Sequence, residues 1–162
     1  MMKKTAYMGL AIAATLILSY VEMLVPFYFG IPGMKLGLPN LLVVFILYLY
    51  GWKEAFTVNV LRIVLNAFLF GNMYGLLYSL AGALCSFIIM LLCKKMKFFS
   101  MVGVSLAGGV FHNVGQCIVA VLVVNTVQVF YYLPFLVIAG AVTGFLLGIA
   151  AREVLEKMKR ET

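Results

Sequence analysis

The stretch that decides the fold is WKEAFTVNVLRIVLNAFLF, residues 52–70, which carries Arg62 in its middle. Its length and apolar character predict a membrane-spanning helix, and a guanidinium stays charged in proteins. An arginine at mid-bilayer costs at least ~2.5–3.5 kcal/mol on insertion scales. Asn59, Arg62 and Asn66 recur at i, i+3 and i+7, so they share one helical face. We predict that this face looks inward, onto partner groups or a ligand.

The composition indicates that a lipid bilayer is the solvent of this chain. Of its 162 residues, 65% are hydrophobic and only 10% are charged, and the mean hydropathy is +1.14. A soluble domain of this size keeps too much surface exposed to hide that much apolar area. The sequence therefore predicts an all-α integral membrane protein with a single domain over residues 1–162.

Six apolar segments predict six transmembrane helices, because a span needs about 20 residues. The predicted spans are residues 5–25, 36–51, 53–70, 74–93, 99–124 and 129–151. In the second span the uninterrupted apolar run, 41–50, is too short to cross at 1.5 Å per residue. This span must include part of the LGLPN stretch, be broken, or be shielded by the preceding loop. Irregular backbone at membrane depth needs protein or a cavity beside it, so the segment is a candidate wall of a binding site.

Basic residues lie mostly on one side of the predicted spans. Only Lys35 lies on the side opposite the termini. This asymmetry predicts a multi-pass protein of the plasma membrane with both termini in the cytoplasm. The basic residues occupy short loops without interleaved aromatic residues, which argues against nucleic acid as the partner of a chain with a net charge of +7. Those on the terminus side are Lys3, Lys4, Lys53, Lys94, Lys95, Lys97, Arg152, Lys157, Lys159 and Arg160.

Polar side chains are expected to converge in the outer half of the membrane. The helical rise places Arg62 ~14 Å and His112 ~20 Å from the cytoplasmic edge, so the two meet near mid-bilayer if their helices pack together. Glu22 lies further out, beneath the Pro/Gly-rich loop 26–39, which is the expected lid. The candidate substrate-binding residues are Arg62, Asn66, His112, Asn113, Gln116, Asn59, Asn40 and Lys35.

Each of these residues also has a structural alternative. Arg62 could pair with Glu22, the one acidic side chain inside a predicted span, or donate to helix carbonyls. His112 could donate to a neighbouring helix carbonyl, and Asn40 and Lys35 could serve turn and cap chemistry. One histidine and three scattered cysteines do not supply the three or four ligands of a zinc site, so neither a metal nor a cofactor is expected.

Small residues predict two kinds of helix contact. Gly9 and Ala13 on the first span allow another helix to approach closely, and we expect a partner subunit to dock there. Gly140, Gly144 and Gly148 recur at every fourth residue, a pattern typical of helix packing rather than of chemistry.

Enzymatic activity is not expected. The chain contains no aspartate, and magnesium-dependent chemistry on diphosphates normally needs clustered carboxylates to hold the metal. It also lacks a phosphate-binding GxxxxGK[ST] motif, so it does not hydrolyse ATP itself.

Several motifs resemble the Gx transporter family, whose members are often labelled heptaprenyl diphosphate synthase component I. They are PGMKLGLPN (32–40), YGWKEAFTVNVLRI (50–63), SLAGALCS (79–86), VSLAGGVFHNVGQ (104–116), FYYLP (130–134) and AGAVTG (139–144). Pro39 departs from the alanine of many relatives. The family is similar in turn to the S components of energy-coupling factor transporters. That similarity implies a six-helix subunit that binds a vitamin or cofactor precursor from outside and docks through its first helix on a transmembrane coupling subunit served by ATPases.

Two other functions stay open at this point. The chain could be a non-transporting membrane scaffold in an isoprenoid, quinone or electron-transfer system. It could also be an isoprenoid enzyme, for which the missing carboxylates are unfavourable. Copurifying proteins would separate transport from scaffolding, and magnesium-dependent turnover by the isolated chain would reveal the enzyme.

Overall fold

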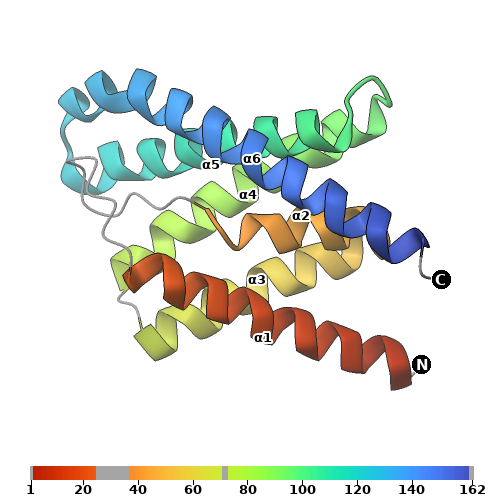
Figure 1. The fold of residues 1–162 in the computed structure, drawn as a ribbon. Coiled ribbons are helices and arrows are strands. Elements are labelled where there is room, and N and C mark those ends of the chain that lie inside the picture. The colour runs from red at the N-terminus through yellow and green to blue at the C-terminus, as the bar shows by residue number, and fades with distance from the viewer. Residues whose placement is uncertain (1, 25–36, 71–72, 161–162) are drawn as a thin grey trace.

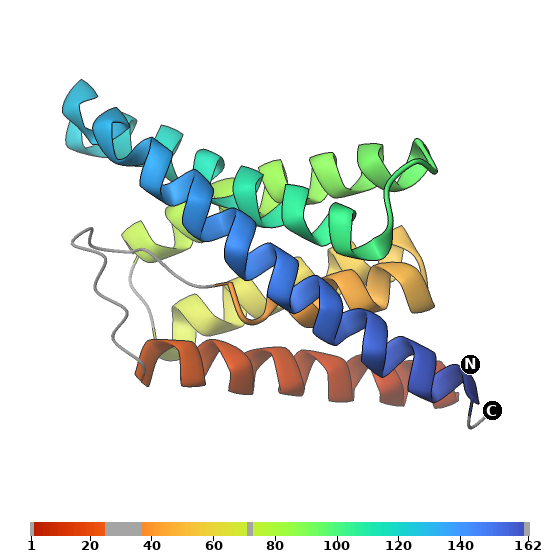
Figure 2. The same ribbon diagram turned by 45° about the horizontal axis from the view of Figure 1, so that its top comes forward.

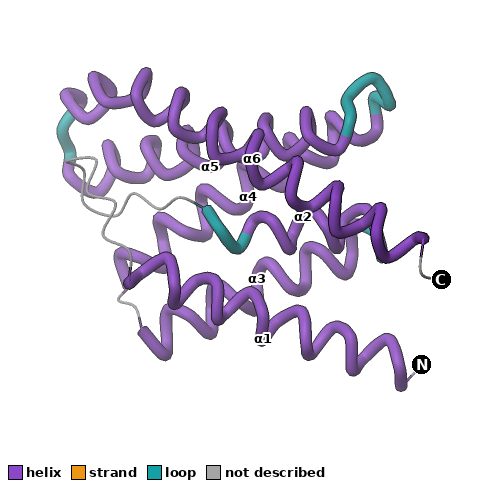
Figure 3. The backbone as a smooth tube through the Cα atoms, viewed as in Figure 1, coloured by secondary structure: helices purple, strands orange, loops and turns teal. Residues whose placement is uncertain are grey.

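The computed structural model describes residues 2–24, 37–70 and 73–160, and every element within these ranges is a helix (Figures 1 and 3). The predicted all-α class is confirmed. Both termini lie at the same end of the helix bundle (Figures 1 and 2). The elements are α1 (Met2–Leu24), α2 (Asn40–Leu49), α3 (Trp52–Phe70), α4 (Met73–Lys95), α5 (Met101–Val124), the 3-10 helix η1 (Val127–Tyr132) and α6 (Leu133–Arg160).

Two helix boundaries differ clearly from the prediction. The last span was expected over 129–151, but residues 127–132 form η1 and α6 begins at Leu133; the polar tail beyond the span continues the same helix to Arg160. The extension is polar and carries an i,i+4 ion pair between Arg152 and Glu156, with 3.4 Å between Nε and Oε1. Such pairs stabilise a solvated helix by a few tenths of a kcal/mol, about 0.3–0.5. The second span was expected over 36–51, but only residues 40–49 are helical.

Within the described ranges, four segments are long and apolar enough to cross a membrane by length and composition, which supports a membrane protein. They are Thr5–Glu22, Gly75–Lys95, Met101–Val124 and Val127–Arg160. The ten residues of α2 rise about 15 Å, half of a typical hydrocarbon core of about 30 Å. The nineteen residues of α3 would cover about 28 Å, but Lys53, Glu54 and Arg62 lower its hydropathy.

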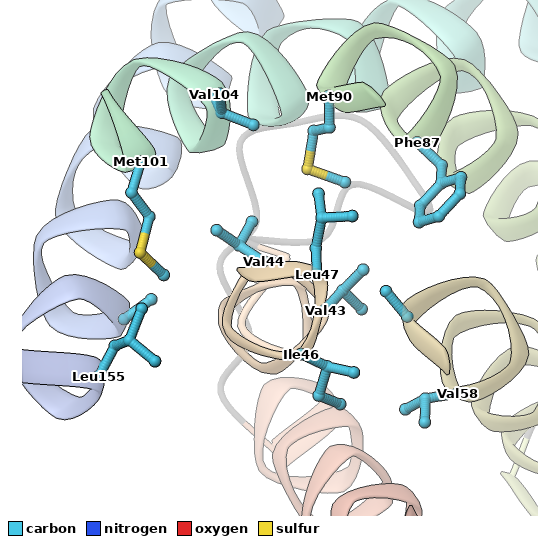
Figure 4. Close-up of a cluster of buried hydrophobic side chains, with 12 residues drawn as sticks. Val43, Val44, Ile46, Leu47, Val58, Phe87, Met90, Met101, Val104 and Leu155 are labelled. Carbon is cyan, nitrogen blue, oxygen red and sulfur yellow. The ribbon is translucent and has the colours of Figure 1, made fainter. Parts of the chain in front are cut away.

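The short helix α2 is the centre of the core. Its sequence, NLLVVFILYL, is apolar on all sides after Asn40, as expected of a helix surrounded by others. Val43, Val44, Ile46 and Leu47 are at most 1% exposed. Figure 4 shows α2 along its axis, with side chains from four other helices around it, namely Val58 of α3, Phe87 and Met90 of α4, Met101 and Val104 of α5, and Leu155 of α6.

Lys94, near the end of α4, holds the C-terminal end of α2. Its Nζ donates to the carbonyl of Leu47 at 2.5 Å and lies 4.6 Å from the ring centroid of Tyr48. A cation at this position satisfies a terminal carbonyl and interacts favourably with the helix dipole.

Lys94→Met should therefore lower the free energy of unfolding by about 1–2 kcal/mol, since it removes a charge-assisted hydrogen bond and a cation–π contact. Thermal unfolding of the purified protein in detergent measures this loss. The control is Lys95→Met at the neighbouring exposed position, for which we expect no comparable change. Equal stability of the two variants would contradict the role given to Lys94.

Glycines bring α5 and α6 into backbone contact, as the four-residue spacing predicts. A Cβ at Gly140 would lie 2.5 Å from the carbonyl oxygen of Gly109, and one at Gly144 would lie 2.7 Å from that of Ser105. A Cβ at Gly148 would lie 2.9 Å from Cα of Val102. The packing role of this glycine series is confirmed.

Candidate functional site

The chain changes direction immediately before α2, beside a polar pocket. Gly37 has φ +79°, a left-handed conformation that glycine adopts without strain. Its carbonyl accepts the backbone N–H of Asn40 at 2.8 Å, which closes the turn. Its own N–H donates to Oε1 of Glu22 at the end of α1. Within the described residues of the second span, helix begins only at Asn40, and Gly37 of the irregular backbone before it lines a cavity.

Arg62 lies on the buried face of α3 and is held by two asparagines. Its Nε and Nη2 both donate to Oδ1 of Asn59, at 3.1 and 2.9 Å. Nη2 also donates to Oδ1 of Asn40 at 3.1 Å, which connects α3 to the first turn of α2. Arg62 is 8% exposed and Asn59 is 3% exposed. The groups that hydrogen-bond the guanidinium are therefore neutral amides, which orient the charge without cancelling it.

The Glu22 carboxylate interacts electrostatically with Arg62 and faces the same pocket. The described residues show no ion pair in hydrogen-bonding contact between Arg62 and Glu22, although their opposite charges attract. The hydrogen bonds of the guanidinium nevertheless go to amide oxygens, whereas Glu22 accepts the N–H of Gly37. Neutral amide groups therefore orient Arg62, and the negative charge of Glu22 faces the same pocket.

The pocket between α1, α2, α3, α4 and α5 is small and largely polar. Its volume is about 20 Å³, room for roughly one water-sized group. Five of the predicted residues meet here, and His112 of α5 shares the pocket with Arg62 as their depths predicted. The lining residues are Ser19, Glu22, Gly37, Asn40, Arg62, Ile63, Asn66, Ser79 and His112.

Asn66 lines this pocket without using its buried acceptor. Its Oδ1 has no hydrogen-bond partner among the residues that the structure describes. An unpaired buried polar atom costs roughly 1–3 kcal/mol, so native structures rarely leave one without a reason. A ligand with a donor group would satisfy it.

Three predicted site residues do not line the pocket. Asn113 donates from Nδ2 to the carbonyl of Leu136 at 2.7 Å and so connects α5 to α6. Gln116 packs against Gly82 of α4, one turn beyond His112. Asn59 acts indirectly, through Arg62. Lys35 and most of the expected lid, residues 26–39, lie outside the described residues.

The sequence reasoning missed four lining residues, of which Ser19, Gly37 and Ser79 are the informative ones. Ser19 lies three residues before Glu22, so helical spacing places both on one face. Ser79 lies four residues after Gly75 and four before Ala83, a spacing of small residues that is typical of helix packing rather than of a site. Gly37 precedes a proline and an asparagine, which is a turn pattern.

The opposite face of α1 is exposed. Thr15, Ser19 and Glu22 are buried, whereas Gly9 and Ala13 are exposed on the other side of the helix. A Cβ at Gly9 would meet no atom within 4 Å. Gly9 and Ala13 therefore do not pack against the other described helices of this chain.

The family model described as heptaprenyl diphosphate synthase component I matches residues 11–154. The chain belongs to this family. Members of the Gx transporter family carry this label, so the resemblance of the motifs is confirmed. No curated protein and no solved structure matched the chain. The match to the heptaprenyl diphosphate synthase component I family spans all the helices that line the pocket.

Proposed function

We propose that the chain is the membrane-embedded substrate-binding subunit of an uptake system for a small polar molecule, such as a vitamin or cofactor precursor. The observation that carries this proposal is Arg62, a buried charge that neutral amides orient toward a polar pocket at the start of a half-length helix. Discontinuous helices that end near mid-membrane commonly form transporter sites.

The membrane arrangement is part of the proposal. In it the chain crosses the plasma membrane six times, α2 occupies the cytoplasmic half, and both termini face the cytoplasm. The common location of the termini at one end of the bundle and the ten basic residues on that side support this orientation. The pocket would then open toward the outside.

Energy for uptake would come from partner ATPases through a transmembrane coupling subunit that docks on α1. The exposed small residues Gly9 and Ala13 support this surface, since close helix approach in a membrane needs small side chains. The absence of aspartate from the sequence supports binding over magnesium-dependent synthesis, despite the family's label.

Copurification from native membranes tests this function. We expect coupling and ATPase subunits to be retained by the natural chain and lost, by about tenfold or more, from Gly9→Leu/Ala13→Leu, because bulk on this face separates the helices. The control is Val142→Leu, a substitution at an exposed position of α6. Recovery of prenyltransferases or redox proteins instead would support the scaffold function that the family's label suggests.

A second test separates pocket geometry from general strain. Gly37→Ala and Gly51→Ala both place alanine at a positive φ, +79° and +111°. At Gly37 the new Cβ would lie 2.9 Å from Nδ2 of Asn40, so it would displace the Asn40 side chain that accepts a hydrogen bond from Arg62. At Gly51 the nearest atom would be 3.5 Å from the new Cβ. Both variants should lose about 1–3 kcal/mol of stability.

Only Gly37→Ala should also lose the thermal stabilisation that a small-molecule extract of the native cells gives the purified protein. Equal stabilisation of the two variants by the extract would show that Asn40 does not position the binding site.

A further inference from the structure

Arg62, which lines the pocket, has N–H donors for which the described residues supply no acceptor. A guanidinium has five N–H groups. The hydrogen bonds to Asn59 and Asn40 use only Nε and Nη2. The Nη1 edge is therefore available to an acceptor oxygen of a ligand.

The same pocket also contains hydrogen-bond acceptors, on Glu22 and Asn66. Glu22 is 9% exposed and presents a carboxylate, of which Oε1 accepts the N–H of Gly37. An ionised carboxylate accepts hydrogen bonds and carries a negative charge, so it favours a donor group and disfavours an anion beside it. Oδ1 of Asn66 is a second acceptor, with no partner in the described ranges.

These groups are complementary to a ligand edge that both accepts and donates. An acceptor-only anion would satisfy Arg62 but would lie against the carboxylate of Glu22 and leave Oδ1 of Asn66 unpaired. Sites built to hydrogen-bond a substrate N–H or O–H discriminate strongly against analogues that lack it, because buried polar groups are then left unsatisfied. The small volume of the pocket admits only the head group of a larger molecule.

We infer that the ligand enters this pocket with a neutral amide-like edge, a carbonyl oxygen beside an N–H or O–H donor, and that the pocket rejects phosphate and diphosphate groups. This inference rests on the proposed function and defines the substrate class of the same site. It separates the chemistry of the pocket from the diphosphate named in the family's label.

Formamide and formate form a matched pair of probes. Each is small and carries one formyl proton, but only formamide has N–H donors, and only formate is an anion. Saturation transfer from the full-length protein in deuterated detergent to the formyl proton measures the binding of each. We expect formamide to bind about tenfold more tightly than formate. Pyrophosphate should not displace it.

Variants locate the effect in the pocket. Arg62→Ala should abolish the signal of both probes, and Asn66→Leu should weaken formamide selectively. Glu22→Gln should raise the affinity for formate and reduce the ratio between the probes. Tighter binding of formate, or displacement of formamide by pyrophosphate, would overturn the inference while leaving a binding pocket. Absence of any signal that depends on Arg62 would overturn the proposed function together with the inference.

Discussion

Gly140→Ala should lower the free energy of unfolding by about 2–4 kcal/mol, a large loss for a single added methyl group. Its Cβ would lie 2.5 Å from the carbonyl oxygen of Gly109 and 2.9 Å from Nδ2 of Asn113. Neither the backbone of α5 nor the hydrogen bond from Asn113 to Leu136 can give way without separating α5 from α6. Overpacking of this kind typically costs about 1–3 kcal/mol, and more where backbone must move.

Gly9→Ala is the matched control, because the same methyl group would meet no atom within 4 Å. Alanine has a helix propensity better than that of glycine by about 1 kcal/mol in water, so this variant should be as stable as the natural chain or slightly more so. Thermal and denaturant unfolding in detergent compare the two. Equal stability of both alanine variants would contradict the close approach of α5 and α6.

Arg62→Ala should abolish the stabilisation that the small-molecule extract gives the purified protein. The substitution removes the one arginine or lysine among the described residues that line the pocket and frees the oxygens of Asn59 and Asn40. It also removes the cost of inserting a charge, ~2.5–3.5 kcal/mol, which offsets part of the lost hydrogen bonding. We therefore expect a folded monomer that no longer responds to the extract, as measured by thermal unfolding and size-exclusion chromatography.

Glu22→Ala supplies the comparison for this experiment. If Arg62→Ala and Glu22→Ala both unfold the chain, the interaction between the two charges serves stability and the structural explanation holds. If both variants fold and only the response to the extract is lost, the charges serve ligand binding.

The sequence predicts several residues of this site well because two strong physical constraints act on them. The cost of a charge in the membrane required Arg62 to face inward, and helical spacing placed Asn59 and Asn66 with it. The helical rise allowed His112 to meet Arg62, and both residues line the pocket although α3 and α5 are far apart in the chain. Six helices followed from apolar length, and the glycine spacing of α6 predicted its packing.

The sequence could not resolve which neighbours of these residues share the pocket. His112 and Asn113 are adjacent in sequence, so on a helix they point about 100° apart, and Asn113 turns toward α6 instead. Gln116 does share a face with His112 but lies one turn further along. Gly37 and Ser79 reach the pocket only through tertiary packing, which local patterns do not encode. The sequence also did not predict where α2 begins, because the helix starts after a turn in which the carbonyl of Gly37 accepts the N–H of Asn40.

The central claim is that the pocket at Arg62 binds a small molecule, and Asn66→Leu tests it most directly. Oδ1 of Asn66 has no partner among the described residues, so an apolar side chain of similar size should leave the unliganded fold as stable as before, or more stable. Native mass spectrometry of the protein released from membranes measures any bound small molecule. We predict that the natural chain and Lys95→Met carry the same additional mass, and that Asn66→Leu is folded but lacks it. Retention of that mass by Asn66→Leu and by Arg62→Ala alike would contradict the account.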